Sequence, residues 1–260
     1  MRIATWNING LRARIDYLVL WLQAESPDIV GLQELKLEDD QFPHERLDEI
    51  GYGAACHGQK SWNGVAVLYR TGLDVDVVER GLPGQEALGA RLITARVGPF
   101  LFTTVYCPNG KHVGHSDFPR KLAWFDVLAD HLVSAHRPDE EHVVCGDFNI
   151  CPAPIDSWNE EQLAGRIFHT AEERARIDRL FDWGLRDLFR ELNPDVQAFS
   201  WWDYRAGAFH RGHGLRIDLV LGTGPVRARA RTAEIHRGWR KKQQGLTASD
   251  HAPVVVDLAP

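Results

Sequence analysis

Short apolar runs alternate with polar and glycine-rich turns along most of the chain, and a few longer segments show helical spacing. Apolar runs of this length, bounded by turn residues, are typical of buried strands. The expected strands are residues 2–7, 28–33, 53–57, 65–69, 91–97, 100–106, 143–145, 215–221, 226–236 and 254–258. The fifth and sixth of them predict a hairpin around Gly98 and Pro99.

Two segments carry apolar residues at steps of three and four, which predicts amphipathic helices. The first helix is expected to end at Ser26 and Pro27, and its periodic positions are Leu11, Ile15, Leu18 and Leu22. The second helix is expected over 118–135, and its periodic positions are Leu122, Phe125, Leu128 and Leu132. Further helical segments are expected at 40–50 and 171–181.

The order of these elements predicts the fold class. Many strands interleave with few helices, which favours an α/β fold with two mixed β-sheets packed face to face and helices outside. No linker-like tract rich in Gly, Ser or Pro divides the chain, so we expect a single domain over residues 1–260. A chain of this length can bury a substantial core.

Composition narrows the class of protein only slightly. A formal net charge of −6 argues against a protein that coats nucleic acid non-specifically, but it leaves room for a nuclease with a locally basic cleft. The cysteines form no CxxC pair and are expected to be reduced core or strand-end residues: Cys56, Cys107, Cys145 and Cys151. The first residues enter a strand directly, and no apolar run is long enough for a membrane span. We therefore expect a soluble cytoplasmic protein.

The stretch 142–151, HVVCGDFNIC, is the most informative of the chain. A buried strand runs into Gly146 and then presents Asp147 and Asn149, which point to the same side because they are two residues apart. A buried carboxylate is unfavourable unless it is paired, bound to a metal or solvated in a cleft. Taken alone, the stretch fits either a strand-end turn or an active site.

Other strands also end in carboxylates, amides or a hydroxyl. The set is Asn7, Glu34, Tyr106, Asp147, Asn149, Asp218, Asp250 and His251. Each member has a structural alternative of its own, such as a turn, a helix cap, an ion pair or a core aromatic residue, but these alternatives explain the whole set poorly. If the strands belong to two packed sheets, their ends can converge. Hard oxygen donors of this kind suit Mg²⁺ or Mn²⁺, whereas the histidines and cysteines lack the spacing of a zinc site.

The sequence resembles a known family, the exonuclease III family of apurinic/apyrimidinic endonucleases within the exonuclease–endonuclease–phosphatase superfamily. The matching stretches run in order along the chain: WNINGLRAR, PDIVGLQE, GYGAACHGQK, NGVAVL, YCPNG, GDFNICP, FSWWDYR, GLRIDL and SDHAPV. GDFN and SDH mark the superfamily, while WWDYR and GLRID are typical of the DNA-repair branch. The resemblance implies a DNase I-like, four-layer α/β sandwich with the catalytic residues on one rim between the sheets.

The resemblance also implies roles for the strand-end residues. The metal-binding acid falls on Glu34, assisted by Asn7 and by Asp250. The wider set of candidate metal-binding residues is Asn7, Glu34, Asp147, Asn149, Asp250 and His251. The candidate catalytic residues are Tyr106, Asp147, Asn149, Asp218 and His251. Either Asp147 or His251 could be the general base, and the number of metal ions stays open.

Basic and aromatic residues in several loops are candidates for contacts with DNA, although such loops can also be merely solvated surface. They are Lys60, Trp62, Lys111, His112 and Arg205. By resemblance, Trp201 and Leu215 would line a pocket for an extruded abasic sugar. Asn109 stands where exonuclease III has Gln, and the loop 111–115 also departs from the family, so His112 or His115 could narrow that pocket.

The resulting expectation is a Mg²⁺-dependent DNA-repair nuclease, with Mn²⁺ as a substitute, acting as a monomer on double-stranded DNA. It would cleave 5′ to abasic sites and process blocked 3′ ends as a 3′–5′ exonuclease and 3′-phosphatase. Two alternatives are a superfamily phosphodiesterase or phosphatase on a non-DNA substrate and a non-catalytic DNA-binding module. The balance among the three nuclease activities is open at this stage.

Overall fold

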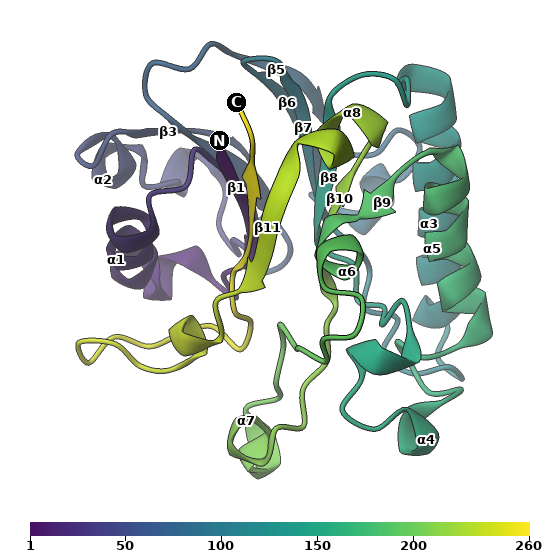
Figure 1. Cartoon of the computed structure of the whole chain (residues 1–260). Helices are drawn as coiled ribbons and strands as arrows, with labels where there is room; N and C mark the ends of the chain where they lie inside the picture. The colour runs from purple at the N-terminus through teal and green to yellow at the C-terminus, as the bar shows by residue number, and fades with distance from the viewer.

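Two six-stranded mixed sheets pack face to face in the computed structural model, which describes residues 1–260 (Figure 1). The first sheet has the order β11 (Ala230–Ile235), β12 (Val254–Leu258), β1 (Arg2–Asn7), β2 (Ile29–Gln33), β4 (Val65–Arg70) and β3 (Tyr52–His57). The second has the order β5 (Val75–Arg80), β6 (Leu92–Val97), β7 (Phe100–Tyr106), β8 (His142–Asp147), β10 (Asp218–Gly222) and β9 (Arg186–Asp187). Only β1–β2 and β7–β8 pair in parallel.

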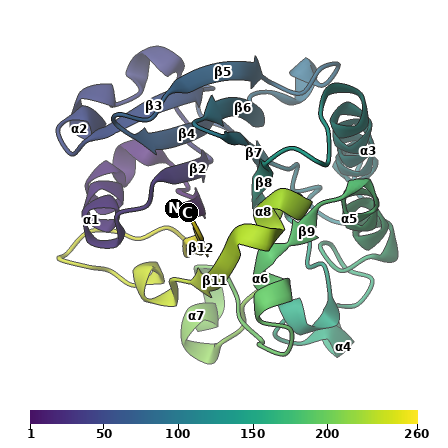
Figure 2. The same cartoon turned by 45° about the horizontal axis from the view of Figure 1, so that its top comes forward.

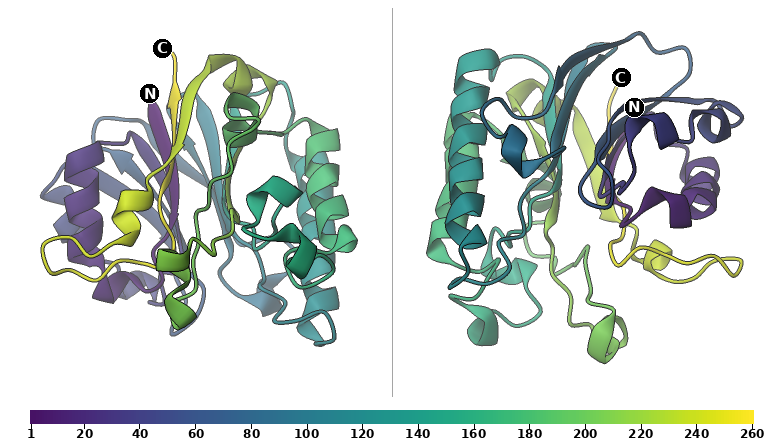
Figure 3. Two further views of the ribbon diagram at one scale, coloured as in Figure 1. Left: turned by 60° about the horizontal axis from the view of Figure 1, so that its bottom comes forward. Right: turned by 180° about the vertical axis from the view of Figure 1, so that it is seen from behind.

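Helices cover the outer face of each sheet (Figures 1 and 3). The first sheet carries α1 (Ile15–Glu25) and α2 (His44–Asp48), and the second carries α3 (Asp117–Ala135) and α5 (Ala171–Trp183). The shorter helices are α4 (Glu160–Leu163), α6 (Leu188–Leu192), α7 (Ala208–Arg211) and α8 (Gly224–Arg229). This arrangement confirms the predicted four-layer α/β sandwich. None of the helices combines the length and the apolar composition needed to cross a bilayer.

Three apolar clusters match the three interfaces between the four layers. The cluster between the sheets contains Phe102 and Val143 from one sheet and Ile3 and Val256 from the other. A second cluster lies beneath α1, and a third lies beneath α3 and α5. Figure 2 shows the two sheets from the end that carries both termini. The loops that carry α4 and α7 project at the opposite end (Figure 1).

Local signals placed most elements correctly. The first helix ends where predicted, because Ser26 takes a left-handed conformation ahead of Pro27. The helix α5 begins at a capping box in which Thr170 and Glu173 exchange hydrogen bonds. All four cysteines are buried and unpaired, as expected.

Two expectations about strands were wrong, and the edge strands β5 and β9 were not predicted. Residues 226–236 are not one strand, because the helix α8 begins at Gly224, with Pro225 in its first turn, and the strand β11 starts only at Ala230. The strand at 215–221 begins three residues late, since Leu215 forms only isolated bridges. The edge strand β5 was not predicted at all, because acidic and basic residues interrupt its apolar positions.

Candidate active site

The ends of the central strands meet at one rim of the sandwich. Parallel pairing sets Asn7 opposite Gln33, so Glu34 follows at the same edge of the first sheet. In the second sheet, Asp147 is the register partner of both Tyr106 and Asp218. The two sheets are joined here, because the Asn7 side-chain amide donates to Asp147 Oδ2 at 2.9 Å.

Asp147 is a buried carboxylate with defined donors on each oxygen. Its Oδ1 accepts the backbone N–H of Asn149 at 2.9 Å, and its Oδ2 accepts the Asn7 amide. The imidazole Nε2 of His251 lies 3.8 Å from Oδ2. Burial raises the pKa of Asp147 to about 7, against the attraction of His251. The carboxylate can therefore exchange a proton near neutral pH.

His251 and Asp218 form a buried pair beside Asp147. The imidazole Nδ1 of His251 donates to Asp218 at 2.8 Å, and the backbone N–H of Asp218 is itself bound by Ser200. Burial alone would lower the pKa of His251, but the Asp218 carboxylate outweighs it and raises the pKa to about 10. The ring is consequently an imidazolium at neutral pH, with its Nε2–H directed to the Asp147 side.

Glu34 lies on the other side of Asn7. Its Oε1 accepts the Tyr106 hydroxyl at 2.6 Å and the Asn7 amide at 3.2 Å, and Lys36 Nζ lies 2.8 Å from Oε2. Burial would raise the pKa of Glu34, but the Lys36 ammonium and the Tyr106 hydroxyl outweigh it and lower the pKa. Burial and then the Glu34 carboxylate raise the pKa of Tyr106 well above its ordinary value, so the phenol stays a donor.

The donor set around Glu34 fits a hard divalent cation. The Glu34 carboxylate and the amide oxygen of Asn9 both contact the Lys36 ammonium, which bridges them as a monovalent counter-ion. Asp147, Asp218 and His251 also offer donor atoms within 4.8 Å of one another. That trio is a poorer metal site, since the His251 imidazolium has a proton on each nitrogen and already neutralises the carboxylates.

Asp250 belongs to the same rim but is separated from Glu34 by Asn9. Its Oδ1 accepts the Asn9 amide at 2.8 Å, and its Oδ2 accepts the Trp201 indole N–H at 3.1 Å. Burial would raise the pKa of Asp250, but the nearby His251 charge and these two donors lower it. Asp250 is therefore an ionised group next to the proposed sugar pocket rather than a direct neighbour of Glu34.

The Asn149 side chain is held by hydrogen bonds to two neighbouring residues of the loop after β7. Its amide donates to Cys107 O at 3.0 Å, and its Oδ1 accepts the Asn109 amide at 3.1 Å. The Asn149 backbone adopts a left-handed conformation, with φ of 51°, that turns its N–H onto Asp147. In this geometry the backbone N–H of Asn149 orients the Asp147 carboxylate, and the Asn149 side chain binds Asn109.

Trp201 and Leu215 lie side by side through backbone pairing, next to His251. They line a hollow of ≈ 340 Å³ whose other apolar walls include Trp158 and Phe168. The indole of Trp158 stacks on His213 with ring centroids 3.7 Å apart. An apolar hollow beside a cluster of ionised groups can hold a small extruded group.

The predicted DNA-contact residues surround this rim on separate loops. Trp62 is 70% exposed, and Lys60 lies on the same loop between β3 and β4. Lys111 pairs with Asp117 at 2.8 Å, and the exposed His112 ring packs against His115. These side chains are accessible to a ligand larger than the hollow.

Arg205 is also accessible, at 87% side-chain exposure, but its guanidinium forms an ion pair with Asp203. Its guanidinium contacts Asp203 through both Nε and Nη2, at 3.0 and 2.8 Å. A phosphate at this position would compete with Asp203.

Sequence reasoning missed three supporting residues. Asn9 links Asp250 to Lys36, and Arg91 lies over the Tyr106 ring at 4.9 Å and donates to Tyr106 O. Lys121 is fully buried on α3, contacts Glu173, and donates to Asn149 O at 2.7 Å. Lys121 lies in the apolar stripe of its helix, three residues after Phe118 and four before Phe125. A lysine at a position that the helical spacing predicts to be buried is the sequence signal that could have identified it.

The fold and this rim define a class of protein: enzymes that hydrolyse phosphoesters with buried carboxylates and an imidazolium between two sheets. The sequence profile of the Endonuclease/Exonuclease/phosphatase family matches residues 4–251, and the chain belongs to that family. Exodeoxyribonuclease III of Haemophilus influenzae is 36% identical over 99% of this chain and 100% of its own length.

Two solved structures share the whole fold. An AP endonuclease from Archaeoglobus fulgidus has a TM-score of 0.93 at 30% identity, with 99% of each chain covered. A variant of the 3′ phosphatase NExo from Neisseria, bound to a product DNA hairpin, has a TM-score of 0.92 at 34% identity, with 100% of each chain covered. The predicted family and fold are confirmed.

Proposed function

We propose that this chain is a DNA-repair nuclease that hydrolyses phosphodiester bonds 5′ to abasic sites and processes 3′ ends as a 3′–5′ exonuclease and 3′-phosphatase. The observation that carries the proposal is the convergence of Asp147, His251 and Glu34 on one rim, joined across the two sheets by Asn7. The named relatives include an exodeoxyribonuclease, an AP endonuclease and a 3′ phosphatase, all enzymes that cleave DNA phosphoesters. All proposed site residues come from one chain, so residues 1–260 are proposed to act as a single domain and as a monomer.

Asp147 is the proposed proton acceptor for the attacking water. The Asn7 amide and the Asn149 N–H hold its carboxylate in one orientation, so no reorganisation is needed when a water approaches. A pKa of about 7 suits a general base at neutral pH. His251 is the weaker candidate, because its pKa of about 10 keeps it protonated.

The imidazolium of His251 is proposed to stabilise negative charge on the phosphoryl oxygens. Asp218 fixes the ring through Nδ1, which leaves Nε2–H as the donor that faces the substrate side. Tyr106 is proposed as a second donor, to the phosphate or to the departing oxygen. Its hydroxyl now binds Glu34 and would have to exchange that acceptor for the substrate.

Glu34 and Asn7 are proposed to hold a divalent cation, with Mg²⁺ the expected ion and Mn²⁺ a substitute. Asp250 and Asn149 also belong to the predicted metal-binding set, but their side-chain oxygens already accept hydrogen bonds. The donor to Asp250 is the Asn9 amide, and the donor to Asn149 is the Asn109 amide. A bound Mg²⁺ supplies charge neutralisation for the phosphate and the leaving alkoxide. The Lys36 ammonium lies beside Glu34 and is expected to keep that carboxylate ionised.

The substrate is proposed to be duplex DNA with an abasic site or a blocked 3′ end. The hollow beside Trp201 and Leu215 is apolar and lies next to His251, which suits a sugar without its base. Lys60, Trp62, Lys111 and His112 are proposed to contact the flanking backbone.

One experiment tests the activity and ranks its three forms. Abasic duplex, 3′-phosphate duplex and blunt duplex are each incubated with the chain in Mg²⁺ or in EDTA. We expect EDTA-sensitive cleavage of the abasic strand on its 5′ side and slower release at the 3′ ends. An Asp147→Asn variant keeps the size of the side chain and is expected to lose activity by at least about 10²-fold. Absence of EDTA-sensitive cleavage on all three substrates would overturn the proposal.

A further inference from the structure

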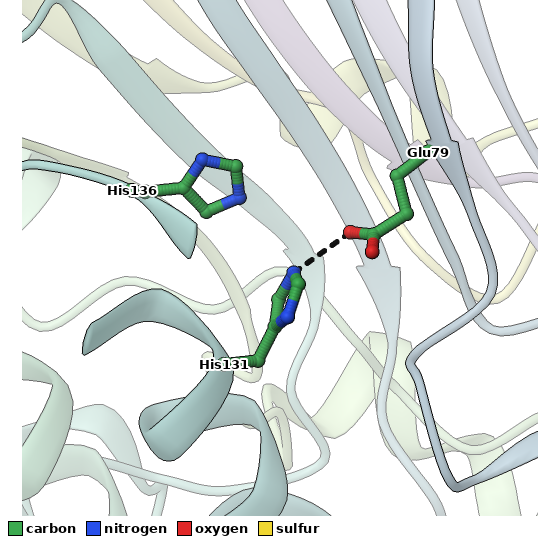
Figure 4. Close-up of side chains that lie close together, drawn as sticks. All are labelled: Glu79, His131 and His136. Carbon is green, nitrogen blue, oxygen red and sulfur yellow. Dashed lines mark hydrogen bonds and ion pairs between the residues drawn. The ribbon is translucent and has the colours of Figure 1, made fainter. Parts of the chain in front are cut away.

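A second cluster of metal-binding side chains lies on the outer side of the second sheet. Glu79 on β5, His131 on α3 and His136 just after α3 place one donor atom each within 4.8 Å of one another. Figure 4 shows these side chains converging from their separate elements, with His131 Nε2 bound to Glu79 Oε2 at 2.8 Å. The three residues are half-buried, so an ion from solvent can reach them.

A β-bulge directs Glu79 to this cluster. In the pairing of β5 with β6, Val77 is opposite Ala95 but Glu79 is opposite Thr94, which leaves Val78 without a partner. Ala95 faces the core between the sheets, so Val77 does as well. Thr94 points to the other face, and Glu79 therefore points toward α3. In a regular strand, Glu79 would share the face of Val77 and its carboxylate would point into the apolar core.

The surroundings of the cluster are polar on the inner side. The His136 ring packs edge-on against His131 and against His142, with ring centroids at 5.3 and 4.8 Å. His142 is buried, and its Nδ1 has no hydrogen-bond partner, while its Nε2 is held by Thr103 at 2.9 Å. Burial lowers the pKa of His136. Arg96 and Glu140, of opposite charge, lie close to the same ring.

We propose that Glu79, His131 and His136 form a binding site for Zn²⁺ or a similar transition-metal ion that fastens the edge strand β5 to the end of α3. Two imidazoles and one carboxylate are preferred Zn²⁺ ligands, and a water completes the tetrahedron. Mg²⁺ is a poor occupant, because it favours oxygen donors. The site lies beside His142, at the beginning of β8, whereas Asp147 ends that strand about 17 Å away. It is therefore separate from the proposed nuclease centre and independent of that proposal.

The site would connect two elements, β5 and α3, that are far apart in the sequence. The strand β5 is the free edge of its sheet, and α3 is the longest helix packed on that sheet. An ion that binds only the folded chain raises the melting temperature by an amount that grows with the logarithm of the ion's excess over its dissociation constant. At a 100-fold excess of Zn²⁺ over its dissociation constant, we expect the melting temperature to rise by about 5 °C or more.

Binding of Zn²⁺ is measured by titration calorimetry on the full chain after chelator treatment and dialysis. A Glu34→Gln/Asp147→Asn background removes donors of the proposed nuclease centre. We expect one equivalent of Zn²⁺ to bind, and Co²⁺ to give the intense visible absorption of a four-coordinate site. Glu79→Gln preserves side-chain size, and His136→Gln removes an imidazole; each should weaken binding by at least about 100-fold. His44→Gln, at an exposed histidine elsewhere, is the matched control and should bind as the parent does.

Three results would overturn the proposal: no saturable Zn²⁺ binding in the parent, binding unaffected by both Glu79→Gln and His136→Gln, or loss of binding in His44→Gln. Circular dichroism and the metal-free melting temperature establish that each variant is folded. His131→Gln replaces any variant that is not. In the otherwise unaltered chain, Glu79→Gln and His136→Gln should leave cleavage of the abasic duplex unchanged, whereas a fall would mean that this cluster belongs to the nuclease centre.

Discussion

The Asn7 amide nitrogen lies 2.9 Å from Asp147 Oδ2 and joins the two sheets at the proposed catalytic rim. Asn7 ends β1 in one sheet and Asp147 ends β8 in the other. The same nitrogen lies 3.2 Å from Glu34 Oε1, so one amide orients both the proposed base and the proposed metal ligand. Catalysis at this rim therefore depends on how the two sheets are packed.

Asn7→Ala is expected to lower kcat on abasic duplex by about 10²-fold, because Asp147 loses one of its two fixed donors. The measurement is steady-state cleavage in Mg²⁺. Asn193→Ala is the matched control, since its amide binds only Phe189 and Ala233 carbonyls away from the rim. A wild-type kcat for Asn7→Ala would show that Asp147 needs no orientation from the first sheet.

Asp218→Asn is expected to lower kcat/KM by about 10²–10⁴-fold. The Asp218 carboxylate outweighs burial and raises the pKa of His251 to about 10, so its removal allows the imidazole to lose its proton at lower pH. The variant should therefore lose more activity at pH 9 than at pH 6, relative to the unaltered chain. The check is the pH profile of kcat/KM for both proteins. Parallel profiles would contradict the imidazolium role.

The buried Lys121–Glu173 pair is expected to behave as a unit in stability. Glu173→Leu leaves the ammonium without its partner in the core and should lower the free energy of unfolding by about 3–5 kcal/mol. Lys121→Met combined with Glu173→Leu should be clearly less destabilising, because no isolated charge remains. Urea denaturation of Glu173→Leu, of Lys121→Met and of the double variant gives the coupling energy between the two residues. Additive losses would contradict the prediction.

Asp156 should make stability depend on pH in the acidic range. Burial would raise the pKa of Asp156, but the guanidinium of Arg216, at 2.7 Å, and that of Arg190, at 2.6 Å, outweigh it and lower the pKa. A lowered folded-state pKa contributes stability above the unfolded value of about 3.9, and that stability is lost as the pH falls through the folded value.

Chemical denaturation of the chain and of Asp156→Asn between pH 7 and pH 3 measures this contribution. The difference in unfolding free energy between them should be constant from pH 7 to about pH 5 and should shrink below about pH 4. A difference that grows on acidification would have the wrong sign and would exclude the ion pairs with Arg216 and Arg190 as its source.

Sequence alone located most elements and all eight strand-end residues of the proposed site. Hydrophobic spacing identifies which side of an element is buried and where it ends, and turn residues mark the boundaries. Glu34 and Asp147 were recognisable because Glu34 directly follows a buried strand and Asp147 ends one. Spacing could not identify β5, because its exposed charges hide its pattern. It could not separate α8 from β11 either, because the apolar positions of 226–236 fit a strand although α8 extends to Arg229.

The tertiary structure decided which side chains touch. Asn7 and Asp147 are 140 residues apart in sequence, and only the packing of one sheet on the other brings them to 2.9 Å. Packing likewise assigned the Asn149 side chain to Cys107 and Asn109, and a single bulge turned Glu79 away from the core and toward His131. The sequence by itself determined most of the elements, the family and the residue types at the rim, because these follow from local periodicity and motif. Hydrogen-bond partners, pKa values and the second cluster depend on distances of a few ångström between separate elements, which local periodicity does not encode.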